Sequence, residues 1–306
     1  MNSRNFSVVV MQIVAALAIP LFAVSALLAA EDQRVAMTGI LGALDEEVQM
    51  IRQEMSNSKE VRMLGRRFLV GTLRGRPVVL AQTGVGKVNA ATITALVLER
   101  FRPREVIFTG IAGGLNPTLR PGDIVVGTKL VQHDLGSYTP EGFVPRTWAN
   151  PVDGKTNPLF FASEPYLIAM VERASRLVSL DSFDDNGVVR KPTIVKGIIA
   201  TGDAFIASEA KKHDIRKQSQ ADAVEMEGAA VAQVCYQAGV PLVVIRSLSD
   251  SADNHATHDV QRFVGIAAQN SASLVMKTVE LLAEQKVDVQ SPPAESKTTT
   301  QSNTAR

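Results

Sequence analysis

The chain has 306 residues, of which 45% are hydrophobic and 21% are charged. Its 32 Lys+Arg and 31 Asp+Glu leave a formal net charge of +1. This balance argues against a nucleic-acid partner, because phosphate binding needs a concentrated excess of cations. The apolar fraction can bury a core, which excludes wholesale disorder. The single cysteine, Cys235, excludes an intrachain disulfide and a CxxC zinc site.

Residues 1–30 have the order of an export signal. Arg4 and the free amine give a positive start, residues 6–30 carry no charge, and small residues gather just before Glu31. This order predicts a secretory signal peptide with an ambiguous cleavage point, and therefore a periplasmic or secreted protein. The uncharged run could also span a bilayer, so an uncleaved membrane anchor at residues 6–30 stays open as the alternative.

The other end of the chain is polar and broken by prolines. Residues 287–306 hold almost no large apolar side chain, so burial there cannot offset the entropy of ordering, and we expect a disordered tail. One folded domain is therefore expected over residues 31–286.

The middle of the chain alternates apolar strands with helices. In chain order we expect a strand at 35–44, a helix opening at Asp45, strands at 66–73 and 76–84, a helix at 88–101, a strand from 105 that runs into a glycine turn at 110–114, strands at 123–134, 196–201 and 241–250, and helices near 227–238 and 259–285. This alternation predicts an α/β domain with a central, mostly parallel mixed sheet flanked by helices. Residues 136–191 lack a clear pattern apart from a helix near 164–178, which favours a lid, a binding loop or an interface.

Several familiar motifs fail on inspection. Gly84-Val85-Gly86-Lys87 resembles the end of a phosphate-binding loop, but Ala81 stands at the required first glycine and Val88 replaces the magnesium-binding Ser/Thr. No GxGxxG follows a strand, and no GxSxG is present. These absences disfavour a nucleotide-dependent enzyme and a serine hydrolase.

His255 and His258 lie close to Asp253 in the sequence. A polar loop leading into a helix explains them better than a metal site does. We therefore expect neither a metal nor a cofactor.

Four acidic residues stand where apolar strands end. Glu47 follows the first strand, Glu225 and Glu227 flank Met226, and Asp250 ends the last strand. Each alone could be an ordinary helix-start or turn carboxylate. Ligands bind beyond the carboxyl ends of parallel strands, so acids converging there beside the glycine turn would form a hydrolytic site without a metal.

Seven ordered blocks carry a family resemblance, namely GALDEEV (42–48), TGVGKVNAA (83–91), TGIAGGL (109–115), PGDIVV (121–126), TGDAFI (201–206), VEMEGAAVA (224–232) and VIRSLSD (244–250). Over about residues 35–284 the chain resembles the bacterial 5′-methylthioadenosine/S-adenosylhomocysteine nucleosidases of the nucleoside phosphorylase superfamily. The resemblance implies hydrolysis of the N-ribosidic bond of an adenine nucleoside, with release of adenine.

The resemblance also implies a role for each matching residue. Glu47 would polarise the attacking water, Asp250 would protonate N7 of the adenine, and Glu227 would hold the ribose hydroxyls. The remaining substrate-binding positions are Met226 against the sugar, Phe205 and the Ile206 backbone at the adenine, Ala112 and Gly113 on the purine side, Ser249 and Arg246 orienting Asp250 and the water, and Glu225. For this chemistry Asp250 must be protonated while Glu47 stays ionised.

Three features depart from the family pattern. Ile111 replaces a small hydroxyl residue, Val260 replaces a phenylalanine near the 5′ group, and the loop at 136–160 is longer. Since phosphorylases of the superfamily use such a hydroxyl to hold phosphate, Ile111 favours water as the acceptor. A nucleoside phosphorylase and an exported nucleoside-binding protein without activity remain the alternatives.

The usual role of the family is cytoplasmic recycling of methylthioadenosine in methionine salvage, so a signal peptide is unexpected. The resemblance also implies a homodimer. Residues 134–150 support that expectation, because their apolar side chains, which include Tyr138 and Trp148, would rarely be exposed in a free loop. A loop folded back on its own domain is the alternative.

Overall fold

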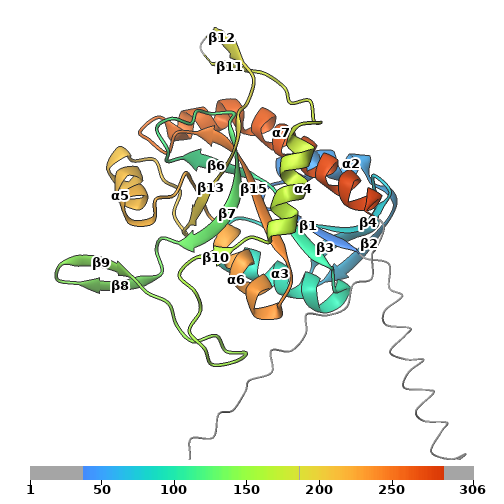
Figure 1. The fold of residues 1–306 in the computed structure, drawn as a ribbon, viewed down its shortest axis with the longest axis horizontal. Coiled ribbons are helices and arrows are strands. Elements are labelled where there is room, and N and C mark those ends of the chain that lie inside the picture. The colour runs from blue at the N-terminus through green and yellow to red at the C-terminus, as the bar shows by residue number, and fades with distance from the viewer. Residues whose placement is uncertain (1–36, 186, 286–306) are drawn as a thin grey trace, which may run out of the picture.

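The computed structural model describes residues 37–185 and 187–285. The predicted signal peptide or anchor and the predicted tail lie outside these residues. Within them, one large mixed sheet is flanked by six helices, which confirms the expected α/β class (Figure 1). In the described part of the chain no helix combines the length and the apolar composition needed to cross a membrane.

The large sheet has eleven strands in the order β10-β7-β13-β14-β6-β15-β5-β1-β4-β3-β2. In chain order they are β1 (Thr38–Gly42), β2 (Ser56–Met63), β3 (Arg66–Leu73), β4 (Arg76–Gln82), β5 (Glu105–Phe108), β6 (Ile111–Gly114), β7 (Ile124–Gln132), β10 (Phe161–Ala162), β13 (Ile194–Thr201), β14 (Ala223–Glu225) and β15 (Leu242–Asp250). The run β4-β1-β5-β15-β6 is parallel, whereas β2, β3 and β10 pair antiparallel at the two edges. A further antiparallel pairing of β7 with β15 closes β7, β13, β14, β6 and β15 into a ring.

The helices cover both faces of this sheet. They are α2 (Asp45–Glu54), α3 (Lys87–Phe101), α4 (Pro165–Ser175), α5 (Glu209–Ser219), α6 (Gly228–Ala238) and α7 (Ala256–Glu284). Ile40 belongs to the core cluster formed with α2, α4 and α7, and its neighbour Leu41 belongs to the cluster formed with α3 and α6. Because successive strand residues point to opposite faces, this buried strand is apolar at every position except Thr38.

One expectation about the elements was wrong, and strands β2 and β14 and helix α5 were missed. The segment expected as a glycine turn at 110–114 is mostly strand β6, which pairs with β15 and β14. Helix α5 was not expected at all, because its only buried side chains are Ile215 and Ser219 and it therefore lacks an apolar stripe. The irregular region 136–191 also contains two hairpins, β8 (Gly136–Thr139) with β9 (Gly142–Pro145) and β11 (Phe183–Asp185) with β12 (Val188–Arg190).

The parallel strands bring separate loops to one edge of the sheet. The carboxyl ends of β1, β4, β13 and β15 lead to Glu47, to the loop 83–86, to the loop 202–206 and to Asp250, respectively. This is the edge at which open α/β sheets bind ligands.

Candidate active site

A cavity of about 220 Å³ opens at this edge of the sheet. Its lining residues are Ala43, Leu44, Glu47, Val85, Ile111, Ala112, Gly113, Phe205, Val224, Glu225, Met226, Glu227, Ser249, Asp250 and Val260. Two larger cavities, of about 340 and 320 Å³, lie beside the arginines of β3 and beside Trp148, and neither is lined by an acidic residue. Chemistry that needs convergent carboxylates therefore belongs in the 220 Å³ cavity.

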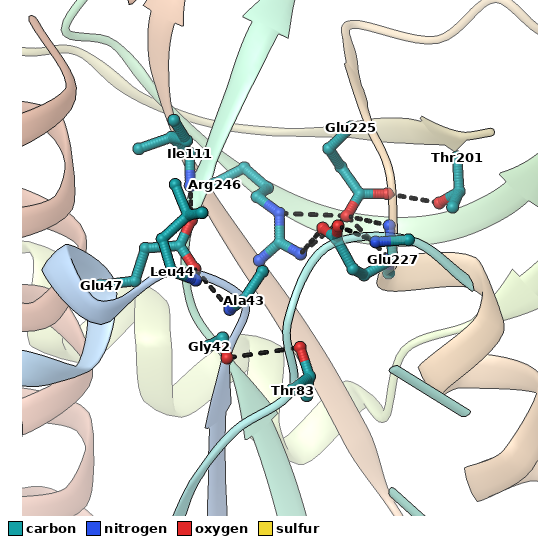
Figure 2. Close-up of polar contacts among 12 residues, drawn as sticks. Gly42, Ala43, Leu44, Glu47, Thr83, Ile111, Thr201, Glu225, Glu227 and Arg246 are labelled. Atoms are coloured by element: carbon teal, nitrogen blue, oxygen red, sulfur yellow. Dashed lines mark hydrogen bonds and ion pairs between the residues drawn. The ribbon is translucent and has the colours of Figure 1, made fainter. Parts of the chain in front are cut away.

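Glu47 is held by backbone amides at the start of α2. One carboxylate oxygen accepts hydrogen bonds from the amides of Ala43 (2.5 Å) and Leu44 (2.9 Å), and the other accepts from the amide of Ile111 (3.0 Å) (Figure 2). The residue is only 3% exposed. Burial raises the pKa of Glu47, and the charge of Arg246 and the amide hydrogen bonds oppose that rise.

Asp250 lies at the end of β15 and is buried. Its carboxylate accepts hydrogen bonds from the Ser249 hydroxyl (2.8 Å) and from the Ala252 amide (2.8 Å). Burial raises the pKa of Asp250 to about 6, against the effect of these two hydrogen bonds. This agrees with the expectation that its surroundings disfavour the charged form. The expected contrast with Glu47 is weaker than supposed, because burial raises the pKa of both carboxyls.

Glu227 occupies the N-cap position of α6, but its side chain does not cap that helix. Instead it accepts a hydrogen bond from the Gly86 amide (2.8 Å), in the loop after β4. Burial and the neighbouring Glu225 raise the pKa of Glu227 to about 8, and Arg246, with a guanidinium nitrogen 3.9 Å from the carboxylate, opposes this rise.

Glu225 lines the cavity, but its carboxylate is engaged by the protein. It accepts hydrogen bonds from the Thr201 hydroxyl, from the amides of Glu227 (3.1 Å) and Gly228 (2.7 Å), and from the Arg246 guanidinium (2.7 Å) (Figure 2). With this many donors around it, Glu225 fixes its neighbours in place and has little capacity left for a ligand.

The expected contact between Arg246 and Asp250 is not present. Its guanidinium pairs with Glu225 and Glu227 and lies 4.1 Å from the centre of the Phe108 ring, with no contact to Asp250 within the described residues. The family resemblance implied that Arg246 orients Asp250, and the two residues are only four positions apart in the sequence. On an extended strand, however, that spacing carries Arg246 roughly 13 Å away along the backbone. Ser249 does contact Asp250, as expected.

The other predicted substrate-binding residues also surround this cavity. Ala112, Gly113, Phe205 and Met226 line it directly, and Ile206 lines a narrow extension next to Asp250. Phe205 is 51% exposed. The segments that the sequence singled out therefore lie around one cavity.

Several residues that line the cavity or contact its carboxylates were not predicted as site residues. Ala43, Leu44, Val85 and Val224 were not singled out as site residues, since apolar residues next to a strand carry no distinctive signal. The Gly86 amide was missed as well, although the Gly-Val-Gly-Lys segment that contains it was noticed.

The described residues contain no group of three or more His, Cys, Asp or Glu side chains placed to hold a metal ion. Asp253 accepts a hydrogen bond from the His255 amide (2.8 Å), and the side chain of His258 is 78% exposed. His255 is the N-cap residue of α7, and His258 lies in the first turn of that helix.

Comparison with known proteins agrees with this geometry. The family model for the phosphorylase superfamily matches residues 38–280. A 5′-methylthioadenosine/S-adenosylhomocysteine nucleosidase from Anoxybacillus flavithermus is 40% identical over 244 residues, covering 79% of this chain and 97% of that protein. The chain belongs to the methylthioadenosine/adenosylhomocysteine nucleosidase family.

Solved structures place the chain in the same family. The nucleosidase from Neisseria meningitidis, in complex with methylthio-immucillin-A, is similar at a TM-score of 0.69 and 36% identity, over 80% of this chain and 99% of that one. A futalosine hydrolase from Helicobacter pylori is similar at a TM-score of 0.68 and 30% identity, over 81% and 98% of the two chains. The fold of the family thus also occurs in an enzyme named for a different nucleoside.

Proposed function

We propose that this protein hydrolyses the N-ribosidic bond of 5′-methylthioadenosine, S-adenosylhomocysteine or a similar nucleoside, and releases adenine. The observation that carries the proposal is the placement of Asp250, an almost fully buried acid with a pKa raised to about 6, in one cavity with Glu47 and Glu227. The names of the related nucleosidases support the same reaction.

The reaction places positive charge on the sugar and negative charge on the departing purine. Asp250 meets the purine charge by donating its proton to N7, and a positioned proton transfer of this kind contributes about 10²–10⁴-fold in rate. Glu47 polarises the attacking water, and its carboxylate stabilises the sugar cation, as carboxylates do in glycosidases. Three backbone amides already fix the Glu47 carboxylate, so little reorganisation is needed during the reaction.

Glu227 holds the ribose 2′- and 3′-hydroxyls. Its carboxylate is fixed by the Gly86 amide on one side and by the charge of Arg246 on the other. Arg246 and Glu225 act as positioning residues, because their contacts lie within the protein. The Met226 side chain packs against the sugar.

The adenine contacts Phe205, Ile206, Ala112 and Gly113. The backbone amide and carbonyl of Ile206 make no hydrogen bond to another described residue, so both are available to the purine edge. Phe205, half exposed at the cavity mouth, closes over the ring face. Together these contacts supply one hydrogen-bonding edge and one apolar face, as an adenine requires.

Ile111 argues against the phosphorylase alternative. Its side chain lines the cavity and packs against the cluster of Phe183 and Phe263, so it places apolar surface where a phosphate would need donors. A binding protein without activity is also disfavoured, because binding alone does not need both a buried acid such as Asp250 and a second carboxylate such as Glu47.

The test is release of the free purine base, which is adenine for an adenine nucleoside and hypoxanthine for inosine, from a panel of purified nucleosides. Methylthioadenosine, adenosylhomocysteine, futalosine and inosine are each incubated with the protein, with and without phosphate. We expect release from the first two, without any need for phosphate. Cleavage of futalosine alone would replace the proposed substrate class, and the absence of cleavage throughout the panel would favour the binding-protein alternative.

We also propose a homodimer in which the region 134–150 covers part of the neighbouring pocket. The β8–β9 hairpin projects from the body of the molecule (Figure 1). Tyr138 is 86% exposed and Trp148 is 53% exposed, and the 320 Å³ cavity opens beside Trp148. Exposed apolar side chains gathered in one region are typical of a protein interface.

Export is the last proposal, and it rests on sequence residues that the structure does not describe. We propose that cleavage leaves a mature chain starting between about residues 24 and 31, outside the cytoplasm. Mass spectrometry of the fractionated native protein tests this. An intact chain in the membrane fraction would favour the anchor at residues 6–30, and an intact soluble cytoplasmic chain would exclude export.

A further inference from the structure

The Gly84-Val85-Gly86-Lys87 segment, which fails as a phosphate loop, lies at the wall of the active site. It connects β4 to α3, and Lys87 is the first residue of that helix. The amide of Gly86 donates to Glu227 (2.8 Å), and the next amide, that of Lys87, donates to the carboxylate of Asp203 (2.7 Å). Two successive amides therefore bind two acidic side chains from different segments, Glu227 at the start of α6 and Asp203 in the loop after β13.

Lys87, Asp134 and Asp203 close a ring of polar contacts. The Lys87 ammonium lies 2.6 Å from one carboxylate oxygen of Asp134, and the other oxygen of that carboxylate accepts from the Asp203 amide (2.8 Å). The Asp203 side chain accepts from the Lys87 amide, which completes the ring. The three residues come from the start of α3, the end of β7 and the loop after β13, so the ring joins segments far apart in the sequence.

This ring differs from an ordinary surface ion pair. The side chain of Lys87 is 17% exposed and that of Asp134 is 32% exposed, and two of the three links use backbone amides, which fixes their geometry. Burial raises the pKa of Asp134, but the Lys87 and Asp203 hydrogen bonds and the nearby positive charge outweigh it, so the pKa lies below its ordinary value. Asp134 is therefore ionised at neutral pH.

His133, the residue before Asp134, makes a second contact between the end of β7 and the loop after β13. His133 is buried, and a Cβ placed on Gly202 would lie only 2.3 Å from its Nε2 atom. The loop after β13 therefore packs directly on the end of β7, where the close approach requires a glycine. The ring and this contact hold the same two segments together.

Two members of the ring, Lys87 and Asp203, lie close in sequence to a part of the site. Lys87 follows Gly86, which holds Glu227 on the ribose side, and Asp203 precedes the segment with Phe205 and Ile206 on the adenine side. We propose that the Lys87–Asp134–Asp203 ring is a positioning device that sets the spacing between the ribose-binding and adenine-binding walls of the pocket. The inference rests on the proposed function and adds three positioning residues to it.

The test compares Lys87→Met, Asp134→Asn, the double variant and Lys87→Arg with the wild type. Loss of one charged contact in a fixed site costs on the order of tenfold in affinity, so we expect the Kd for adenine and the KM for methylthioadenosine to rise about 10-fold. The kcat should fall by less than about threefold, because the ring touches no reacting atom. The double variant should resemble the worse single variant, since one ring is broken in each case. Lys87→Arg should keep most of the affinity.

Lys196→Met is the matched control, because it removes a lysine–carboxylate pair of similar length, Lys196–Glu172 (2.5 Å), away from the pocket. Ring variants that melt at lower temperature but keep the wild-type adenine Kd and KM would overturn the proposal, since the ring would then be structural only. A wild type that binds adenine but cleaves no nucleoside would remove the proposed function, and the adenine Kd of the variants would still decide the role of the ring.

Discussion

Arg246 and Glu225 form a buried ion pair, 2.7 Å apart, at the centre of the carboxylate cluster, with side chains only 1% and 3% exposed. Removing one partner of such a pair leaves an uncompensated buried charge, which costs about 3–5 kcal/mol. We therefore expect Arg246→Met to lower the free energy of unfolding by that amount, measured by chemical denaturation. The double variant Arg246→Met/Glu225→Gln should recover part of the loss, and a single variant as stable as the wild type would contradict the assignment.

Asp250→Asn tests the proposed acid. The amide can still accept from the Ala252 backbone through its oxygen and donate to the Ser249 hydroxyl through its nitrogen, so the local structure should persist. Without a proton to donate, kcat should fall about 10²–10⁴-fold. Asp253→Asn, in the exposed turn just beyond, is the control and should stay near wild type. Turnover of Asp250→Asn within a few-fold of wild type would remove Asp250 from the mechanism.

The same substitution should change how stability depends on pH. The pKa of Asp250 is raised by burial from 3.8 to about 6, so its contribution to stability is fully present below the unfolded pKa and is lost as the pH rises through about 6. The asparagine side chain of the variant does not titrate. Between about pH 4.5 and 7.5 the Asp250→Asn variant should therefore gain about 2 kcal/mol relative to wild type. Parallel pH profiles of unfolding free energy for the two proteins across this range would show that the pKa is not raised.

The sequence predicted the alternation of elements and the convergence of Glu47, Glu227 and Asp250, because strand ends in a parallel sheet meet at one edge. It did not predict strand β6, since glycines are poor strand formers. The structure shows why they are there. A Cβ on Gly110 would lie 2.6 Å from a Glu47 oxygen, and one on Gly113 would lie 2.7 Å from an Asp250 oxygen. The glycines allow the backbone to approach the two carboxylates, a tertiary reason that no local pattern reveals.

The sequence also did not predict which side chains contact one another. Arg246 and Asp250 are close in the chain, yet Arg246 pairs with Glu225 from β14, and the Gly86 amide reaches Glu227 across 141 residues. Such partners follow from the order of strands in the sheet. The sequence does not encode that order as a local signal, whereas residue types and strand ends are visible in it directly.

If the protein forms the proposed dimer, its KM should depend on protein concentration, because the partner subunit covers part of the pocket. Replacing Tyr138 and Trp148 by Ser removes the two most exposed aromatic side chains of the β8–β9 region. Light scattering should show a dimer for the wild type and a monomer for this variant, and the KM should rise with dissociation while the melting temperature changes little. Leu64→Ser, at an exposed turn between β2 and β3, is the control. A fully active wild-type monomer would contradict the proposed interface.

The most direct test of the account is the identity of the sugar product when phosphate is abundant. Methylthioadenosine is incubated with the protein in phosphate buffer, adenine release is followed by absorbance, and the same reaction is monitored by ³¹P NMR. We expect one free sugar for each adenine, no new phosphate ester, and a rate that does not depend on phosphate, because Ile111 and the surrounding apolar wall leave water as the acceptor. Accumulation of a sugar 1-phosphate in step with adenine would contradict hydrolysis and identify a phosphorylase.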